Sequence, residues 1–296
     1  MKRVYILVVL NIIVGACTWA FNETLTVMDT VEMIKLRLHG VQTLHTETLD
    51  ILVRDRCERG RPCRCVALVH GLGDNNKTWG NALLATPKGV RVYAPNMPGT
   101  EGSQRPDSPA GWKIPAQSNV LQSVLSGVEG CPSWTVAGNS LGGWTASWLA
   151  LHWPEGVQKL VLVNSAGLTD STGSSDLAAK TLASPTIESL KKFTKLAFHQ
   201  ERSIPERVWP DVLGRILRRG TYEIASAITQ EDFLDGRLGA LKMPVTILWG
   251  KSDGVIPLAQ AAHFKSEIEH ASVVIVENCG HLPQKECPAA LIAEIY

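Results

Sequence analysis

Apolar and polar residues follow two different periods along this chain, and their order predicts an α/β fold. Over parts of 31–53, apolar residues occupy every second position, which predicts an opening pair of antiparallel strands. Helical patterns at 116–125 and 144–151 lie between later apolar runs, as in a mostly parallel, doubly wound sheet. Buried strands are predicted at the short apolar runs 65–69, 90–94, 134–137, 159–163, 244–250 and 272–276.

This alternation stops between residues 168 and 237. We find no strand pattern there, and apolar residues recur at helical spacing, once within 187–197 and again within 208–217. We therefore predict a helical cap at 168–237, inserted into an α/β core that is formed by 21–167 and 238–296. Between 180 and 220 the cap has nine basic residues against four acidic ones, which predicts a solvated face or, alternatively, attraction to an anionic lipid surface.

The composition is compatible with this predicted fold and excludes several classes of function. Of 296 residues, 45% are hydrophobic and 19% are charged, which is enough apolar material for one large domain with a buried core. A net charge of +1 lacks the basic excess that is typical of nucleic-acid binding. The sequence has no dinucleotide or phosphate-loop glycine pattern and no His/Cys zinc spacing. We therefore expect chemistry without a metal, a cofactor or a nucleic-acid partner.

The first 20 residues have the pattern of an export signal. Two basic residues precede an apolar run at 4–16, which is shorter than the ~20 residues of a bilayer span. The run ends in Val-Gly-Ala before Cys17, a pattern similar to the bacterial lipobox, so Cys17 is a candidate for lipidation. Cleavage after Ala20 and an uncleaved anchor reaching Phe21 are the open alternatives. We expect an exported protein, either secreted or held at a membrane as a periplasmic or cell-surface lipoprotein.

The stretch from Trp134 to Gly143 contains the strongest candidate for catalysis. Gly138, Ser140 and Gly142 form the pattern Gly-x-Ser-x-Gly between a predicted strand and a predicted helix. In such a sharp turn the serine is exposed at the carboxyl end of a strand, where α/β sheets bind ligands. A serine hydroxyl becomes a nucleophile when an imidazole removes its proton and a buried carboxylate orients that imidazole. Asp253 and His281 each follow a predicted strand and complete this set.

These segments resemble the α/β-hydrolase family, and within it the bacterial esterases and lipases with a helical cap. The resemblance runs from about residue 66 to the C-terminus, and its order of Ser, Asp and His is typical of the family. It implies that Ser140 is the nucleophile, His281 the base and Asp253 its orienting acid, acting on a small-molecule ester or lipid substrate. The motifs that carry it are His-Gly-Leu-Gly at 70–73, Gly-Asn-Ser-Leu-Gly-Gly at 138–143, Trp-Gly-Lys-Ser-Asp at 249–253 and Gly-His at 280–281.

The same resemblance implies an oxyanion hole formed by the backbone N–H groups of Leu72 and Leu141. The elbow is shared with the meta-cleavage carbon–carbon hydrolases, which typically have Trp directly after the histidine. This chain has Leu282 there, which favours ester cleavage. Carbon–carbon bond hydrolysis and a non-catalytic binding protein with the hydrolase fold remain the alternatives.

Competing candidates exist for two of the three catalytic positions. His70 lies close to the predicted site, but its place directly before the glycine of the oxyanion loop favours a structural role. Asp232 and Asp235 are alternative acids, yet they lie at the end of the predicted cap and do not follow a core strand.

Seven cysteines support export, because removing Cys17 for a lipid leaves an even number. We expect a bond between Cys279 and Cys287, which flank the loop of His281. The family's sheet places the strands that begin at Cys65 and Cys131 side by side, which implies a second bond. A third would then join Cys57 to Cys63. Scattered core thiols, or a free Cys287 at a helix N-terminus, are the alternatives.

Overall fold

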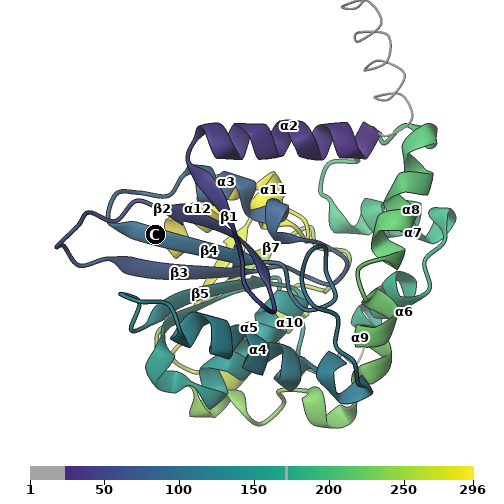
Figure 1. The fold of residues 1–296 in the computed structure, drawn as a ribbon. Helices are drawn as coiled ribbons and strands as arrows, with labels where there is room; N and C mark the ends of the chain where they lie inside the picture. The colour runs from purple at the N-terminus through teal and green to yellow at the C-terminus, as the bar shows by residue number, and fades with distance from the viewer. Residues whose placement is uncertain (1–23, 171–172) are drawn as a thin grey trace, which may run out of the picture.

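A computed structural model describes residues 24–170 and 173–296, so Cys17 and the predicted export signal lie outside the described residues. The centre is a single eight-stranded sheet in the order β1-β2-β4-β3-β5-β6-β7-β8 (Figure 1). The sheet is mostly parallel: only the pairs β1/β2 and β2/β4 are antiparallel. The strands are β1 Val41–His45, β2 Asp50–Asp55, β3 Arg64–Val69, β4 Val90–Pro95, β5 Trp134–Asn139, β6 Val157–Val163, β7 Val245–Gly250 and β8 Ser272–Val276.

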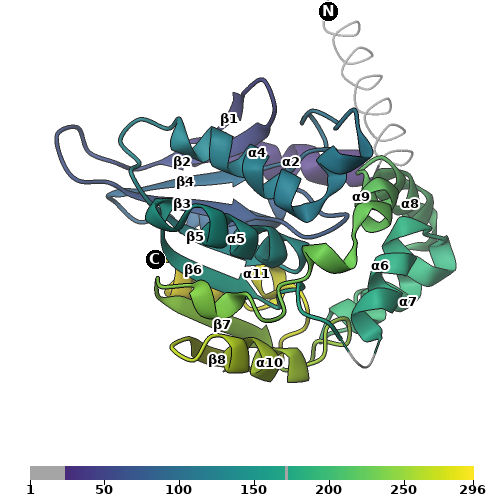
Figure 2. The same cartoon turned by 90° about the horizontal axis from the view of Figure 1, so that it is seen from below.

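Helices cover both faces of this sheet (Figures 1 and 2). One face packs against α4, α5 and α10, and the other against α2, α3 and α12, so each face buries its own apolar cluster. Central strands such as β5 and β7 are buried along their whole length, which explains their continuous apolar sequences. The described helices are α2 Thr24–Leu38, α3 Gly80–Leu84, α4 Ile114–Ser126, α5 Leu141–His152, α6 Ser174–Ala183, α7 Ile187–Ala197, α8 Trp209–Leu217, α9 Thr221–Ala227, α10 Ala259–Glu267, α11 Pro283–Glu286 and α12 Pro288–Ile295.

One sequence prediction is wrong at the start of the fold. Residues 31–38 were expected in a strand, but they form the second half of α2, and the antiparallel pair is β1 with β2. The alternation of Ile34, Leu36 and Leu38 suited a strand, yet it arises because α2 has an apolar inner face and an apolar outer face. Leu36 is fully buried, whereas Ile34 and Leu38 are exposed on the other side of the helix.

Four helices, α6 to α9, follow β6 and precede β7, and we call them the inserted helices. They lie beyond the carboxyl ends of the strands, at the edge of the sheet where Ser140 follows β5 (Figure 2). Among the residues that the structure describes, we find no helix with the length and hydropathy that crossing a bilayer requires.

Six cysteines lie within the described residues, and the structure joins them in three disulfides: Cys57 with Cys63, Cys65 with Cys131, and Cys279 with Cys287. The second bond links the starts of two paired strands, because Cys65 in β3 lies opposite Trp134 in β5. The third closes a loop that contains His281. These are the pairs that the sequence analysis named.

Candidate active site

Ser140 lies in a sharp turn between β5 and α5, with a positive φ of 56° that non-glycine residues rarely adopt. Backbone hydrogen bonds hold this conformation. The Ser140 N–H donates to the carbonyl of Val163 at 3.1 Å, and the Ser140 carbonyl accepts from the N–H groups of Gly143 and Ala166. A strained backbone of this kind costs about 1–3 kcal/mol and persists where its surroundings fix it, which is common at active sites.

The glycines of the elbow are required by close approach of the backbone. A Cβ atom on Gly142 would lie 2.1 Å from the carbonyl oxygen of Val69 in β3. One on Gly138 would lie 2.2 Å from the carbonyl oxygen of Gly142. Both positions therefore exclude any side chain while the turn keeps its present geometry.

Asp253 and His281 form a buried pair at the same edge of the sheet. The Nδ1 of His281 lies 2.7 Å from Oδ2 of Asp253. The other oxygen, Oδ1, accepts hydrogen bonds from the N–H groups of Val255 and Ile256 at 2.7 and 2.9 Å. Because an ionised carboxylate only accepts hydrogen bonds, Nδ1 carries the proton, and Nε2 of the neutral imidazole is the atom that can take a proton.

Asn164, which sequence reasoning missed, also holds this acid. It follows β6 with a φ of 44°, and its Nδ2 donates to Oδ2 of Asp253 at 2.7 Å. Its own Oδ1 accepts from the N–H of Gly250 at 3.1 Å, at the end of β7. The available signal was its place directly after a buried strand, the same signal that identified Ser140 and Asp253.

A cavity of about 820 Å³ brings the predicted site residues together. Ser140, His281, Leu72 and Leu141 all line it. Within residues 24–170 and 173–296, no protein acceptor is assigned to the N–H groups of Leu72 and Leu141, so both can donate to a ligand. The inserted helices and the β7–α10 loop contribute its apolar wall: Leu182, Leu190, Phe193, Val212, Ile216 and Val255.

His70 has a structural arrangement. Its Nδ1 donates to the carbonyl of Gly71 at 2.9 Å, and its Nε2 accepts from the N–H of Met97 at 3.0 Å. Burial lowers the pKa of the His70 imidazole, which keeps the ring neutral, as these two bonds require. Both nitrogens are therefore occupied by backbone groups and hold the loop 70–73, the predicted oxyanion loop.

A charged pair fixes the same loop from the side of the inserted helices. Arg219, between α8 and α9, donates through Nη1 to the carbonyl of Gly73 at 2.6 Å and through Nη2 to Glu101 at 2.7 Å. Burial alone would raise the pKa of Glu101, but Arg219 and Lys77 outweigh it and lower the pKa to about 2. Sequence reasoning missed both members, because they lie 118 positions apart in the chain.

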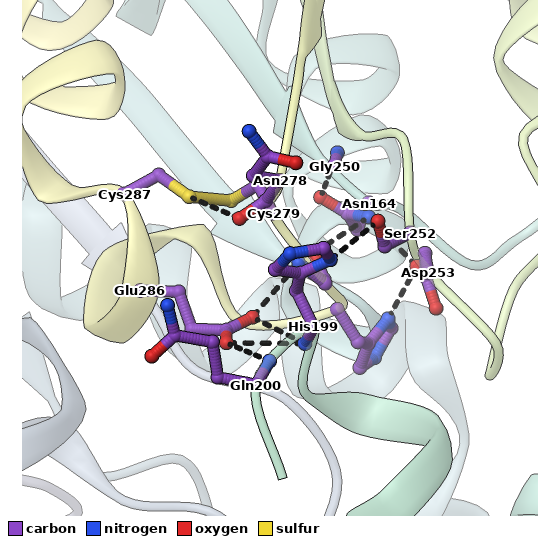
Figure 3. Close-up of a disulfide and its surroundings, with 12 residues drawn as sticks. Asn164, His199, Gln200, Gly250, Ser252, Asp253, Asn278, Cys279, Glu286 and Cys287 are labelled. Atoms are coloured by element: carbon purple, nitrogen blue, oxygen red, sulfur yellow. Dashed lines mark hydrogen bonds and ion pairs between the residues drawn. A yellow bond between two sulfur atoms is a disulfide. The ribbon is translucent and has the colours of Figure 1, made fainter.

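The loop of His281 is held by groups from distant parts of the chain (Figure 3). The His281 N–H donates to the carbonyl of Ala197, the last residue of α7, at 2.8 Å. The carboxylate of Glu286 accepts from the N–H groups of Gly280, His199 and Gln200 at 2.8–3.3 Å. Glu286 therefore ties the histidine loop to the segment that follows α7, directly beside the Cys279–Cys287 disulfide.

The competing acids have other partners. Both Oδ atoms of Asp235 accept from the N–H of Thr169. Asp232 accepts from the N–H and hydroxyl of Thr229 through Oδ2. The carbonyl of Asp232 accepts from the indole N–H groups of Trp144 and Trp148, both at 2.7 Å, which fixes the end of the insertion against α5.

The Gly-x-Ser-x-Gly pattern also occurs a second time, at 250–254, where its serine is Ser252. This serine is exposed, and its hydroxyl lies 2.9 Å from Nδ1 of His199. Ser252 does not follow the strand-to-helix turn of the elbow, and it is not among the residues that line the cavity.

Within the described residues, one group of side chains has the spacing of metal ligands: Asp55, Cys57 and Cys63. Its two sulfur atoms are joined in a disulfide, which removes them as thiolate ligands. The group precedes β3, at the end of the sheet opposite to Ser140.

Comparisons with known proteins agree with this geometry. Two curated relatives are each 26% identical to this chain. The 2-hydroxy-6-oxononadienedioate/2-hydroxy-6-oxononatrienedioate hydrolase 1 of Pseudomonas putida matches over 78% of this chain and 85% of its own length. The monoacylglycerol lipase ABHD6 of Homo sapiens matches over 78% of this chain and 74% of its own length.

A solved structure described as a membrane phospholipase A, a bacterial virulence factor, superposes with a TM-score of 0.78. It covers 99% of this chain and 96% of its own at 23% identity, which is a likeness of fold. The family model described as the alpha/beta hydrolase family matches residues 66–295. The chain therefore belongs to the α/β-hydrolase family, as the order of its motifs implied.

Proposed function

We propose that this hydrolase cleaves carboxylic esters through an acyl-enzyme on Ser140. The observation that carries the proposal is one cavity lined by Ser140, by His281 with its Asp253 partner, and by two backbone N–H groups that can bind an oxyanion. Acyl transfer needs these four functions together, namely a nucleophile, a base, an orienting acid and an oxyanion hole.

In the proposed reaction, Nε2 of His281 takes the hydroxyl proton as Oγ of Ser140 attacks the ester carbonyl. The negative charge on the carbonyl oxygen is stabilised by the N–H groups of Leu72 and Leu141, each by ~3 kcal/mol in comparable sites. His281 then gives its proton to the departing alcohol. Water, activated by the same imidazole, attacks the acyl-enzyme, which releases the acid and restores Ser140.

The shape and chemistry of the cavity favour an ester with an apolar acyl chain. Leu182, Leu190 and Phe193 from the inserted helices line it beside the serine, and their walls would contact such a chain. The lipase among the relatives is in keeping with this choice. The alternative is carbon–carbon bond hydrolysis, which the relative from Pseudomonas putida supports. The same test therefore includes a substrate for that reaction.

The test uses p-nitrophenyl esters of increasing acyl length together with a fluorophosphonate probe of active serines. We expect ester turnover without added metal, and a fall in kcat/KM of about 10⁴-fold or more for Ser140→Ala and for His281→Ala. Ser252→Ala is the matched control, because this serine stands in the same five-residue pattern outside the cavity. Residual ester turnover within tenfold of the parent rate would overturn the role of Ser140. Turnover of a 2-hydroxy-6-oxo-dienoate alone would favour carbon–carbon cleavage.

We also propose that the protein is exported and that its mature form begins at an acylated Cys17. The lipobox-like sequence before Cys17 supports this, together with an even set of six further cysteines. Mass spectrometry of the mature N-terminus tests it: a lipid on Cys17 is expected. An unmodified N-terminus at Phe21 would establish simple secretion, and membrane retention of Cys17→Ser would indicate an uncleaved anchor.

A further inference from the structure

The outer face of α2 exposes a row of large apolar side chains. Met28, Val31 and Leu38 are 62%, 60% and 81% exposed, and Ile34 between them is half exposed. Spacings of three and four residues place all four on one side of the helix. Lys35 is the one charged residue among the positions 28, 31, 34, 35 and 38, and its long side chain can keep the charge in water beside an apolar surface.

The opposite face of α2 holds the helix firmly to the molecule. Leu36 is fully buried in the cluster above the sheet. Asp29 forms ion pairs with Lys77 of the core, at 3.0 Å, and with Arg215 of α8. The outward apolar row is therefore presented by a helix with a fixed orientation, and two apolar faces on one helix call for two apolar neighbours.

We propose that the outer face of α2 lies on the lipid surface of a membrane. The occupant is identified by the chain that leads into the helix: Cys17, the proposed site of the lipid, lies only seven positions before Thr24. Seven residues reach at most ~25 Å, so a bilayer that receives the lipid of Cys17 lies within that distance of α2. Helices that are held flat at an interface have an apolar face towards the lipid, as α2 has.

Charge attraction is the weaker explanation for such a contact. At least five of the nine basic residues between 180 and 220 form ion pairs: Lys191 with Glu206, Lys192 with Glu188, Lys195 with Glu201, Arg215 with Asp29 and Arg219 with Glu101. These pairs compensate the positive charge locally. The contact that we infer is therefore apolar and does not require anionic lipid.

The position of α2 gives the contact a role in catalysis. Helix α8 lies beside the N-terminal end of α2 (Figure 1). Its Arg215 pairs with Asp29 of α2, while its Val212 and Ile216 line the cavity. A membrane against α2 would therefore lie beside the wall of the cavity. This role rests on the proposed ester hydrolysis, whereas the contact with lipid does not.

The first test measures the contact without catalysis. The full chain carries p-benzoylphenylalanine in place of Val31 or, in a second variant, Leu38, and is bound to phosphatidylcholine vesicles with and without phosphatidylglycerol. The control has the same group in place of Val273, which is 41% exposed on β8 at the far edge of the sheet. On irradiation we expect lipid adducts at 31 and 38, in both lipid mixtures, and few at 273. Adducts between two copies of the chain, or lipid adducts equal to the control, would overturn the proposal.

The second test measures the consequence for turnover. Val31→Asp with Leu38→Asp should lower the hydrolysis of an ester dissolved in the vesicles by about fivefold or more, because charge on this face opposes contact with lipid. The rate on a soluble short-chain ester should stay unchanged, which shows that the variant is folded. Val273→Asp should change neither rate. Equal vesicle rates for the variant and the parent would count against the role of α2, whereas loss of all ester turnover in the parent chain would count against the proposed function instead.

Discussion

Ser140 and His281, the proposed nucleophile and base, are held by different means. Ser140 is fixed by backbone hydrogen bonds to β6 and by glycines that allow close packing against β3. The loop of His281 is instead fixed by a side chain, Glu286, by a disulfide, and by the end of α7. The sheet therefore positions the serine, whereas the inserted helices take part in positioning the histidine. Perturbations of the two regions should have different signatures.

Among changes to the groups that hold Ser140 and His281 in place, the largest effect should come from breaking the elbow with Gly142→Ala. The added Cβ would lie 2.1 Å from the Val69 carbonyl oxygen, so β3 and the turn must separate. We expect kcat/KM to fall by about 100-fold or more, because small displacements of a nucleophile are costly. The free energy of unfolding should fall by about 3 kcal/mol. Gly239→Ala is the control, since its Cβ would meet nothing closer than 3.8 Å; equal activity in both variants would contradict this account of the elbow.

A smaller effect on turnover should follow from Glu286→Gln on the histidine side. The amide group of glutamine places N–H donors against backbone N–H groups that now donate to the carboxylate, which weakens the tie between Gly280 and His199. We expect kcat to fall about tenfold with KM nearly unchanged, because the substrate walls stay in place. Glu277→Gln is the matched control, since Glu277 makes an exposed ion pair with Lys251. Steady-state kinetics of both variants decide the point, and equal kcat values would remove Glu286 from the site.

Two disulfides close loops of similar length, so comparing their removal distinguishes a loss of stability from a loss of the position of His281. The double variants Cys279→Ala/Cys287→Ala and Cys57→Ala/Cys63→Ala open loops with sequence separations of 8 and 6 residues. Chain entropy predicts a similar loss of about 2.5 kcal/mol in the free energy of unfolding for each. Only the first pair flanks His281, so we expect a severalfold loss of kcat there and none in the second variant. Denaturant titration and kinetics measure the two effects; parallel losses of activity would show that the bond acts through stability alone.

The smallest effect should be on thermal stability, through the pH dependence of the ion pair of Glu101. The pKa of Glu101 in the folded protein is lowered to about 2 from an ordinary value of 4.5, so its ion pair stabilises the folded state above pH 4.5. That stability is lost as the pH falls from 4.5 towards 2. We expect Glu101→Gln to lower Tm by a few degrees at pH 7, and the difference from the parent should shrink across this window. A Tm difference that stays constant down to pH 2 would contradict the ion pair with Arg219.

Much of this arrangement could be predicted from the sequence, because it depends on local signals. Ser140, Asp253 and His281 each follow a strand whose apolar run is plain, and parallel strands bring their carboxyl ends to one edge. The five-residue serine pattern alone is insufficient, since Ser252, which the sequence analysis did not consider, shares it; the strand-to-helix turn sets Ser140 apart.

What escaped prediction depends on contacts between distant residues. Asn164, Glu286 and Arg219 are polar residues of ordinary kinds, and each depends on at least one partner 86 to 146 positions away. The second half of α2 was assigned to a strand for a different reason. A helix with two apolar faces loses the one-sided pattern by which amphipathic helices are recognised.

The end of α7 suggests how new substrate preferences could arise in this scaffold. The carbonyl groups of Leu196 and Ala197 accept from the acid loop, at Gly254, and from the histidine loop. One or two turns earlier, Leu190 and Phe193 face the cavity with their side chains. The bonds to the loops of Asp253 and His281 are made by backbone carbonyl groups of 196 and 197, which do not depend on the side chains at 190 and 193. Mutations at 190 and 193 can therefore reshape the cavity without removing these bonds. Substrate range and catalytic geometry can then vary independently within a single helix, which makes positions 190 and 193 the natural place to begin a redesign.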